Sequence, residues 1–178
     1  MKYKLLKNVL SKETCEVLSD EIRLIRDVSQ GTHEAWEDTG NSWHEYNIFA
    51  TESLLKRFSP VMSEKFKKEL DPTYSYCRIY YKGGYLAPHK DREACEYSMT
   101  LCLSKTINYP LFVEGIPIEM EIGDAVIYKG RELEHWREEY EGDEHIQVFL
   151  HWVDKNGEYK DFKFDKRKGI GCIRENNG

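Results

Sequence analysis

Residues 78–91 read RIYYKGGYLAPHKD, and this stretch ends in a pattern that can bind a metal ion. A β-type run is followed by turn residues at 82–84, and His89 and Asp91 come shortly after the turn. In an extended segment, side chains two positions apart point to the same side, so His89 and Asp91 can reach one ion. A third ligand from a distant strand would complete a facial triad, the kind of site that holds ferrous iron.

The third ligand has to come from a histidine further along the chain. His135 lies in a loop-like segment directly after the β-type run AVIYK (125–129), whereas His145 and His151 lie inside the next run, EHIQVFLHWV (144–153). A ligand at the mouth of a barrel is expected at a strand end or in a loop, which favours His135. We interpret His151 as a strand residue that is packed or hydrogen-bonded in place.

The composition fits one ordinary globular domain over residues 1–178. The chain has 26 basic and 32 acidic side chains and a net charge of -6, and it lacks a dominant basic stripe, so nucleic-acid binding is not favoured. We find neither a signal-peptide pattern nor an apolar run of roughly 18 residues, the length of a membrane span. The five cysteines form no CxxC pair, which is typical of free thiols. We therefore expect a cytoplasmic protein.

The N-terminal part has two helical patterns. Ser11 can cap a helix with apolar residues at helical spacing, which should end before Gly31. A second helix is expected from near Thr51, with Ser59 and Pro60 as a cap and a first helical position. We expect this second helix to end at Asp71-Pro72, because a residue before proline avoids helical dihedrals.

From residue 74 onwards the pattern changes to short β-type runs separated by turns. Six or more short strands without intervening helices predict a mainly β fold, a jelly-roll barrel behind N-terminal helices. An additional outer strand is expected within residues 31–48. The predicted strands lie at about 74–81, 96–103, 110–113, 117–121, 125–129 and 145–153.

The chain is thereby divided into helical support (1–72), a jelly-roll core (74–154) and a C-terminal strap (155–178). The tail carries seven basic and four acidic residues and has few apolar anchors. We interpret it as a strap across the barrel, with contact to nucleic acid as the alternative.

The stretch quoted first resembles the segment before the iron motif in prolyl 4-hydroxylase-like enzymes, which are iron(II)- and 2-oxoglutarate-dependent oxygenases. Residues 123–128, GDAVIY, followed by His135, resemble the strand of those enzymes that leads to their distal histidine. The similarity covers about residues 74–154. It implies a double-stranded β-helix with the N-terminal helices packed on one sheet, and it implies that His89, Asp91 and His135 hold the iron.

One position departs from this family. An Arg or Lys usually binds the distal carboxylate of 2-oxoglutarate nine or ten residues after the distal histidine, where this chain has Glu144 and His145. Another cation is then needed. Arg78 should share the inward face of Tyr80, whose family counterpart is a common hydrogen-bond donor to the cosubstrate. We expect Arg78, Tyr80, His145 and Gln147 to bind the cosubstrate, the alternative for Arg78 being a solvated strand residue.

Two more arginines follow the proposed ligands closely. We expect Arg92 and Arg137 to form surface ion pairs, and contact with an anionic substrate is the alternative. Ser98 and Thr100 lie on the strand after the motif and are candidates to line the pocket.

The resemblance implies a dioxygenase that couples decarboxylation of 2-oxoglutarate, to succinate and carbon dioxide, to hydroxylation of a C–H bond. Iron(II) would be its cofactor, with ascorbate as an addition. Its partners would be 2-oxoglutarate, dioxygen and a peptide or small-molecule substrate, with a prolyl or other protein residue preferred. Asp91 as a ligand favours hydroxylation over halogenation, because halogenating relatives leave that position open for chloride. A cupin-like metal enzyme that does not use 2-oxoglutarate and a noncatalytic jelly-roll binding module stay open.

Overall fold

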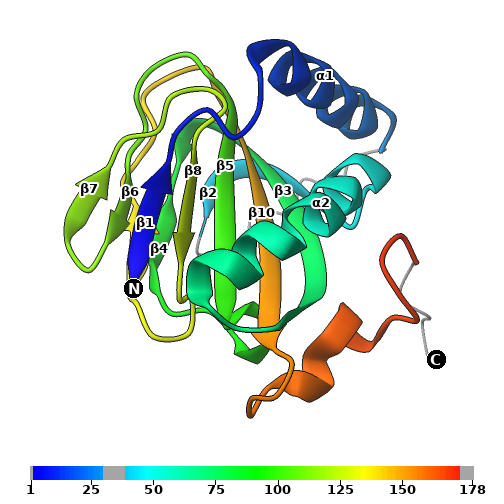
Figure 1. Ribbon diagram of the computed structural model, residues 1–178. Helices are drawn as coiled ribbons and strands as arrows, with labels where there is room; N and C mark the ends of the chain where they lie inside the picture. Colours follow the sequence, from blue (N-terminus) through cyan, green and yellow to red (C-terminus); the bar gives the residue numbers. More distant parts are fainter. Residues whose placement is uncertain (1, 30–38, 173–178) are drawn as a thin grey trace.

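The computed structural model describes residues 2–29 and 39–172 and contains two antiparallel β-sheets (Figure 1). The larger sheet has the strand order β1-β8-β5-β10-β3-β2, and the smaller has the order β4-β9-β6-β7. This confirms a mainly β fold with N-terminal helices. The strands are β1 (Tyr3–Leu6), β2 (Gly40–Tyr46), β3 (Leu70–Gly84), β4 (Leu86–His89), β5 (Tyr97–Lys105), β6 (Leu111–Val113), β7 (Ile116–Ile118), β8 (Ala125–Tyr128), β9 (His135–Arg137) and β10 (Glu144–Asp154).

The first helix, α1 (Lys12–Val28), agrees with the prediction at both ends. Ser11 is its N-cap, and the Ser11 hydroxyl accepts a hydrogen bond from the Thr14 backbone N–H at 3.2 Å. The second helix, α2 (Phe49–Phe66), packs with α1 on the outer face of the larger sheet (Figure 1).

The bounds of α2 (Phe49–Phe66) differ from the prediction. Pro60 lies inside the helix rather than at its first position, and the Ser59 hydroxyl donates to the Leu55 carbonyl within the helix at 2.8 Å. The helix ends at Lys67, whose left-handed backbone (φ 55°) closes the last turn. The residues expected to end α2, Asp71 and Pro72, belong to β3 instead.

Alternation along the larger sheet separates a face that packs against the helices from a face that looks into the space between the sheets. On β10, Ile146, Val148 and Leu150 pack in one core with α1 and α2. Phe149 and His151, which point the other way, line a cavity between the sheets. A second apolar core fills the remaining space on that side, built from residues such as Leu111, Val126 and Leu133. The strands therefore position polar side chains inside the molecule.

The turn expected at 82–84 lies where the chain changes sheets. β3 continues through Gly83, which has a positive φ of 85°, to Gly84. After Tyr85 the chain continues as β4 in the smaller sheet, where His89 lies opposite His135 of β9. This change of sheet carries the HKD motif across the cavity.

The outer strand expected within residues 31–48 is present as β2, which pairs with β3; residues 31–38 lie outside the described part of the chain. Near the C-terminus, residues 160–166 form 3₁₀ turns interrupted by left-handed dihedrals at Phe164 and Asp165. This segment contacts β3, and Arg167 forms a buried ion pair with Glu52 of α2 at 2.7 Å. Residues 173–178 of the expected strap also lie outside the described residues.

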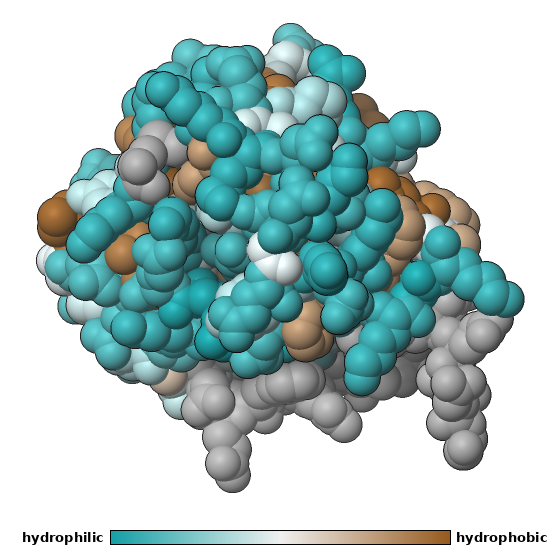
Figure 2. Space-filling model, turned by 60° about the horizontal axis from the view of Figure 1, so that its bottom comes forward, coloured by the Kyte–Doolittle hydropathy of each residue, from teal (hydrophilic) through white to brown (hydrophobic). Residues whose placement is uncertain are grey.

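The surface carries no broad apolar area on the face in Figure 2, which is mostly hydrophilic with apolar side chains in small groups. Neither helix in the described residues combines the length and apolar character needed to cross a membrane. All five cysteines lie in the described part and are free thiols, as expected. The cytoplasmic location stays a prediction.

Candidate metal centre and cavity

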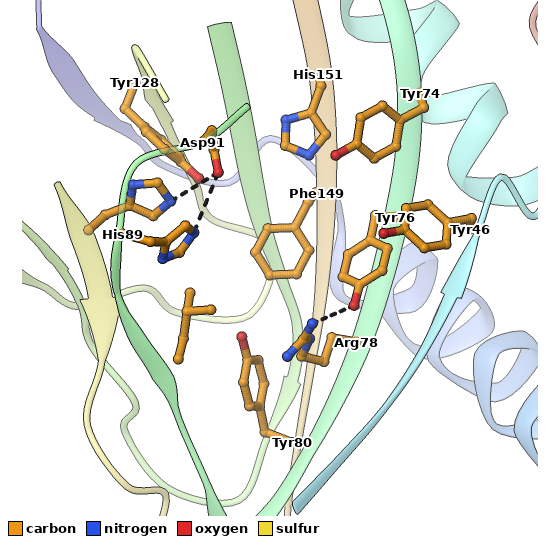
Figure 3. Close-up of a pocket in the computed structure, with 12 residues that line it drawn as sticks. Tyr46, Tyr74, Tyr76, Arg78, Tyr80, His89, Asp91, Tyr128, Phe149 and His151 are labelled. Carbon is orange, nitrogen blue, oxygen red and sulfur yellow. Dashed lines mark hydrogen bonds and ion pairs between the residues drawn. The ribbon is translucent and has the colours of Figure 1, made fainter. Parts of the chain in front are cut away.

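Three predicted ligands come together at one wall of the cavity (Figure 3). His89 ends β4, Asp91 follows it, and His135 begins β9. The Nε2 atoms of both histidines lie 3.5 Å from Asp91 Oδ1, and one ligand atom from each of the three residues falls within 4.8 Å of the others. Two imidazole nitrogens and one carboxylate oxygen therefore converge on a space of metal-ion size.

Backbone carbonyls orient both imidazoles. His89 Nδ1 lies 2.8 Å from the Ala87 carbonyl oxygen, and His135 Nδ1 lies 3.0 Å from that of Leu133. A neutral imidazole has one N–H, and only an N–H can bond a carbonyl, so the Nδ1 atoms carry the protons. The Nε2 lone pairs are left to face Asp91, which is the tautomer that a metal ligand requires.

Asp91 is held in place by its neighbours. The Ser98 hydroxyl donates to Asp91 Oδ2 at 3.1 Å, and the Asp91 backbone N–H donates to the Gly130 carbonyl at 3.0 Å. Burial raises the pKa of the Asp91 carboxyl, but the neighbouring imidazoles of His135 and His89 outweigh it and hold that pKa below its usual range. Asp91 is therefore an anion that is ready to bind a cation.

Gly130 is a site residue that the sequence reasoning missed. A Cβ atom at this position would collide with Asp91 Oδ2 and would lie 2.6 Å from the Cys95 carbonyl oxygen and 2.8 Å from Ser98 Oγ. The absence of a side chain makes room for the carboxylate. Its position between the strand AVIYK and His135 suggested that it lies near the site, but nothing in the sequence indicated which atoms it contacts.

Arg78 and Tyr80 lie across the cavity from the triad (Figure 3). Arg78 is 6% exposed and Tyr80 is 0% exposed, so Arg78 is not a solvated strand residue. The Arg78 Nη2 donates to the Tyr76 hydroxyl, while Arg78 Nη1 and the Tyr80 hydroxyl have no hydrogen-bond partner among the described residues. A cation and a hydroxyl are thus available to an anion that extends from the triad.

His145 and Gln147 are buried close to Tyr80 but are not among the residues that line the cavity. His145 Nε2 and Gln147 Oε1 are 2.7 Å apart, and Gln147 Nε2 donates to the Thr100 hydroxyl. Burial, followed by repulsion from Arg137, lowers the pKa of His145 well below its usual value. His145 is therefore neutral and does not replace the missing cation.

The two arginines expected at surface ion pairs differ. Arg92 pairs with Asp165 at 2.8 Å, with 41% of its side chain exposed, which confirms the prediction. For Arg137 the prediction was wrong, because this residue is 1% exposed and pairs with no carboxylate in the described chain. The alternation of β9 turns Arg137 inward together with His135, and a three-residue strand gives too little pattern to reveal this.

A second group of candidate ligands shares Asp91. Cys95 and His151 each offer a ligand atom within 4.8 Å of it. Burial raises the pKa of the Cys95 thiol well above its usual value, which disfavours the thiolate that binds metals. His151 Nδ1 is hydrogen-bonded to Ser98 at 2.9 Å, as a packed strand histidine was expected to be, although His151 also lines the cavity. The group with His89 and His135 is the better metal site.

The rest of the cavity is aromatic, which the sequence reasoning treated mainly as strand packing. The rings come from β2, β3, β8 and β10 and surround a volume of about 150 Å³. Period-two spacing on β3 was the available signal, but it does not tell a packed face from a cavity wall. The aromatic residues that line the cavity are Tyr46, Tyr74, Tyr76, Tyr80, Tyr128 and Phe149.

Solved structures share this fold. The viral collagen prolyl hydroxylase vCPH from Paramecium Bursaria Chlorella virus-1, solved as a 2OG complex, is 14% identical, with 85% of this chain and 96% of that chain covered and a TM-score of 0.65. A Pseudomonas putida prolyl-4-hydroxylase is 16% identical, with 87% and 93% covered and a TM-score of 0.70.

The α-ketoglutarate-dependent non-heme epimerase SnoN from nogalamycin biosynthesis is 10% identical, with 85% of this chain and 78% of that chain covered and a TM-score of 0.70. SnoN has also been solved with Fe3+, α-ketoglutarate and nogalamycin RO. A scan against protein-family models finds no match, and a search of curated proteins finds none either. At these identities, the likeness is one of fold alone.

Proposed function

We propose that this protein is an iron(II)- and 2-oxoglutarate-dependent dioxygenase that hydroxylates a C–H bond. The observation that carries the proposal is one cavity with His89, Asp91 and His135 at one wall and the buried, incompletely partnered Arg78 opposite. A metal ion at the first wall and a cation at the second match the two ends of a keto diacid. The proposal includes a double-stranded β-helix and the division into 1–72, 74–154 and 155–178.

The donor set fits iron(II). Two neutral imidazoles and one carboxylate suit a first-row divalent metal, and three protein ligands leave positions open for other molecules. Bound there, iron would supply the chemistry of keto-acid binding and dioxygen activation, with ascorbate as an added reductant. The protein's own contribution is to hold His89 and His135 in the metal-binding tautomer and to keep Asp91 ionised.

Arg78 and Tyr80 would bind the distal carboxylate of the cosubstrate. Within the part of the chain that the structure describes, Arg78 Nη1 and the Tyr80 hydroxyl are buried donors without partners, and a carboxylate oxygen would satisfy both. In this proposal His145 and Gln147 support them from behind: Gln147 bonds Thr100, and His145 stands beside Tyr80. The aromatic side chains of the cavity line the space between the two ends.

The substrate is the least defined part of the proposal. The similar structures include prolyl hydroxylases and an epimerase, so the shared fold does not choose a reaction. We propose a peptide or small-molecule substrate at the cavity mouth, with a prolyl or other protein residue preferred. Screening peptides, amino acids and nucleosides for stimulated succinate release would identify it.

Anaerobic titration with iron(II), with and without 2-oxoglutarate, tests the proposed function. We expect a weak visible charge-transfer band that requires both additions, and the Arg78→Gln variant should need more 2-oxoglutarate to reach it. Metal binding without the band would favour a cupin-like enzyme. Absent metal binding, or unchanged binding by a His89→Ala, His135→Ala double variant, would contradict the triad. The control is Arg57→Gln, an exposed residue of α2 outside the cavity lining.

A further inference from the structure

His151 of β10 lines the cavity but is not one of the proposed metal ligands. Its ring lies beside Tyr74 at the top of the view in Figure 3, and one edge of the ring faces the space above Phe149. The residue is 5% exposed, and one of its ligand atoms lies within 4.8 Å of one from Asp91. A group that binds the open edge of this ring is therefore held next to the candidate metal centre.

The hydrogen bonds of His151 determine which ring nitrogen carries the proton. The Ser98 hydroxyl oxygen lies 3.1 Å from Asp91 Oδ2 and 2.9 Å from His151 Nδ1. An ionised carboxylate only accepts hydrogen bonds, so the Ser98 hydroxyl gives its single proton to Asp91. His151 Nδ1 must then donate to the Ser98 oxygen, and in a neutral ring Nε2 is left as an unprotonated acceptor.

The imidazole of His151 is neutral and held in one orientation. Burial lowers the pKa of His151 to about 4. The Tyr74 ring packs against it with the ring centroids 4.6 Å apart, and the Arg92 guanidinium lies over the same Tyr74 ring at 4.6 Å. Among the described residues, none donates a hydrogen bond to His151 Nε2. The cavity thus contains an oriented acceptor whose partner is not part of the described chain.

The charges around His151 favour an uncharged partner. Arg78 is the guanidinium of the cavity lining, and Arg92 lies over the Tyr74 ring. Both would repel an ammonium group, and the repulsion increases once a divalent metal has neutralised Asp91. A carboxylate has no hydrogen to donate. The walls beside His151 are aromatic rings, which favour a flat or ring-shaped group.

We infer that His151 is a specificity-determining residue whose Nε2 accepts a hydrogen bond from an uncharged N–H or O–H group of the substrate. The substrate class is a neutral, ring-shaped compound or residue with such a donor next to the carbon that reacts. The place of the donor beside a reacting carbon rests on the proposed function, whereas the hydrogen bond itself does not. A prolyl residue within a peptide has no N–H of its own, so in a peptide substrate a neighbouring group must supply the donor.

The metal-free, EDTA-treated protein tests the acceptor without any ligand. Long-range ¹⁵N–¹H NMR spectra of the ¹⁵N-labelled protein distinguish protonated from unprotonated imidazole nitrogens, and the His151→Gln variant assigns the signals of His151. We expect a protonated Nδ1 and an unprotonated Nε2 at neutral pH. The opposite tautomer or a doubly protonated ring would overturn the inference, because Nε2 would then be a donor.

Phenol and anisole test the partner, since both are flat and uncharged and only phenol has an O–H donor. By NMR titration of the metal-free protein, we expect phenol to bind about tenfold more tightly than anisole and to shift the His151 Nε2 signal. His151→Leu, which removes the acceptor, should bind the two compounds equally. His151→Gln, whose amide can donate to Ser98 and accept from the ligand, should keep a preference within about threefold of the wild type. Arg57→Gln, an exposed change on α2, should behave as the wild type.

Equal binding of phenol and anisole by the wild-type protein, or no phenol binding, would overturn the inference. An unchanged preference in folded His151→Leu protein would overturn it as well, and would indicate Asp91 as the acceptor. If that variant does not fold, the wild-type spectrum decides the question: phenol binding that leaves the Nε2 signal unmoved also contradicts the inference.

The outcomes for His151 and for the proposed function are separable. A protein that shows the iron and 2-oxoglutarate band but has the opposite His151 tautomer keeps the proposed function and loses the inference. A protein that prefers phenol through His151 but binds no iron loses the proposed function and keeps the acceptor site.

Discussion

Each imidazole of the candidate metal centre is fixed by the carbonyl two residues before it in the chain. The pairs are His89 with Ala87 and His135 with Leu133. The same local geometry on two different strands leaves both Nε2 atoms facing Asp91. Single atoms matter here because a rotated ring or the other tautomer would remove a ligand.

A substitution at Gly130 tests whether Asp91 binds the metal in its present position. Gly130→Ala should displace the Asp91 carboxylate, because the new Cβ would occupy the space of Oδ2 and crowd Ser98 Oγ. We expect metal affinity to fall at least about tenfold, the size of effect seen when a metal site's supporting contacts are lost. The measurement is titration with iron(II) or cobalt(II).

The matched control is Gly169→Ala, in the C-terminal segment. A Cβ there would lie 4.0 Å from Cys172 Sγ, an ordinary contact, so metal affinity should not change. Wild-type affinity in Gly130→Ala would mean that Asp91 is not a ligand in its present position.

A single strand of the larger sheet contributes residues both to the hydrophobic core and to the cavity. β3 presents Cys77 and Ile79 to the helices and Tyr76, Arg78 and Tyr80 to the cavity. Burying the first set stabilises the sheet, and the second set is thereby held rigidly in the interior. A site built on paired strands keeps its geometry better than one built on loops.

The C-terminal segment joins α2 and β3 through one buried ion pair. Arg167→Met should lower the free energy of unfolding by about 3–5 kcal/mol, because it leaves Glu52 buried and unpaired. Glu52 also accepts hydrogen bonds from Ser75 and Gly171. Because it is only 1% exposed, water cannot replace the lost cation. The measurement is the urea midpoint with an unchanged m-value.

An exposed pair on α2 serves for comparison. Lys65→Met removes the contact with Glu64 at 2.8 Å, and the free energy of unfolding should change by at most about 0.5 kcal/mol. Equal effects of the two substitutions would show that the C-terminal segment contributes no more to stability than a surface contact.

The cavity exists only at the scale of the whole molecule. His89 and His135 come from the smaller sheet, and Arg78 and Phe149 come from the larger one. No segment of the chain contains the site, so a metal ion that bridges β4 and β9 binds the folded state far better than the unfolded chain. Binding must then stabilise the entire fold.

The gain in stability depends on the metal concentration relative to its Kd. Nickel(II) at about 100 times its Kd should add about 2.7 kcal/mol to stability. For a chain of this length, that raises the thermal midpoint by about 5–10 °C. Differential scanning fluorimetry should detect the shift in the wild type and in Arg57→Gln, an exposed change on α2. The shift should vanish in Asp91→Ala, and a full shift there would place the metal elsewhere.

How much of the fold and of the site could be predicted depends on how few neighbouring residues each sequence pattern involves. The cap at Ser11 and the period-two runs act over a few residues, so the first helix and the strands β5, β6, β8 and β10 were predicted nearly at their true bounds. The short strands β1, β4 and β9 were not predicted, and β3 extends further at both ends than expected. The prediction that Pro60 begins the second helix was wrong, because a cap motif inside a helix looks the same in the sequence as one at its start. The prediction of a surface ion pair for Arg137 was wrong, because the pattern of a short strand does not show which side chains face inward.

Local patterns were enough to predict the fold class and to name three residues that meet at one wall of the cavity, because strand alternation and motif order are properties of the chain. Which side chains lose their water depends on the folded molecule. Folding buries Arg78 and Arg137 without a carboxylate partner among the residues that the structure describes, keeps His145 neutral and fits Gly130 against Asp91. The reason is physical: charge state and desolvation depend on everything that surrounds a group, and these neighbours come from strands far apart in the sequence.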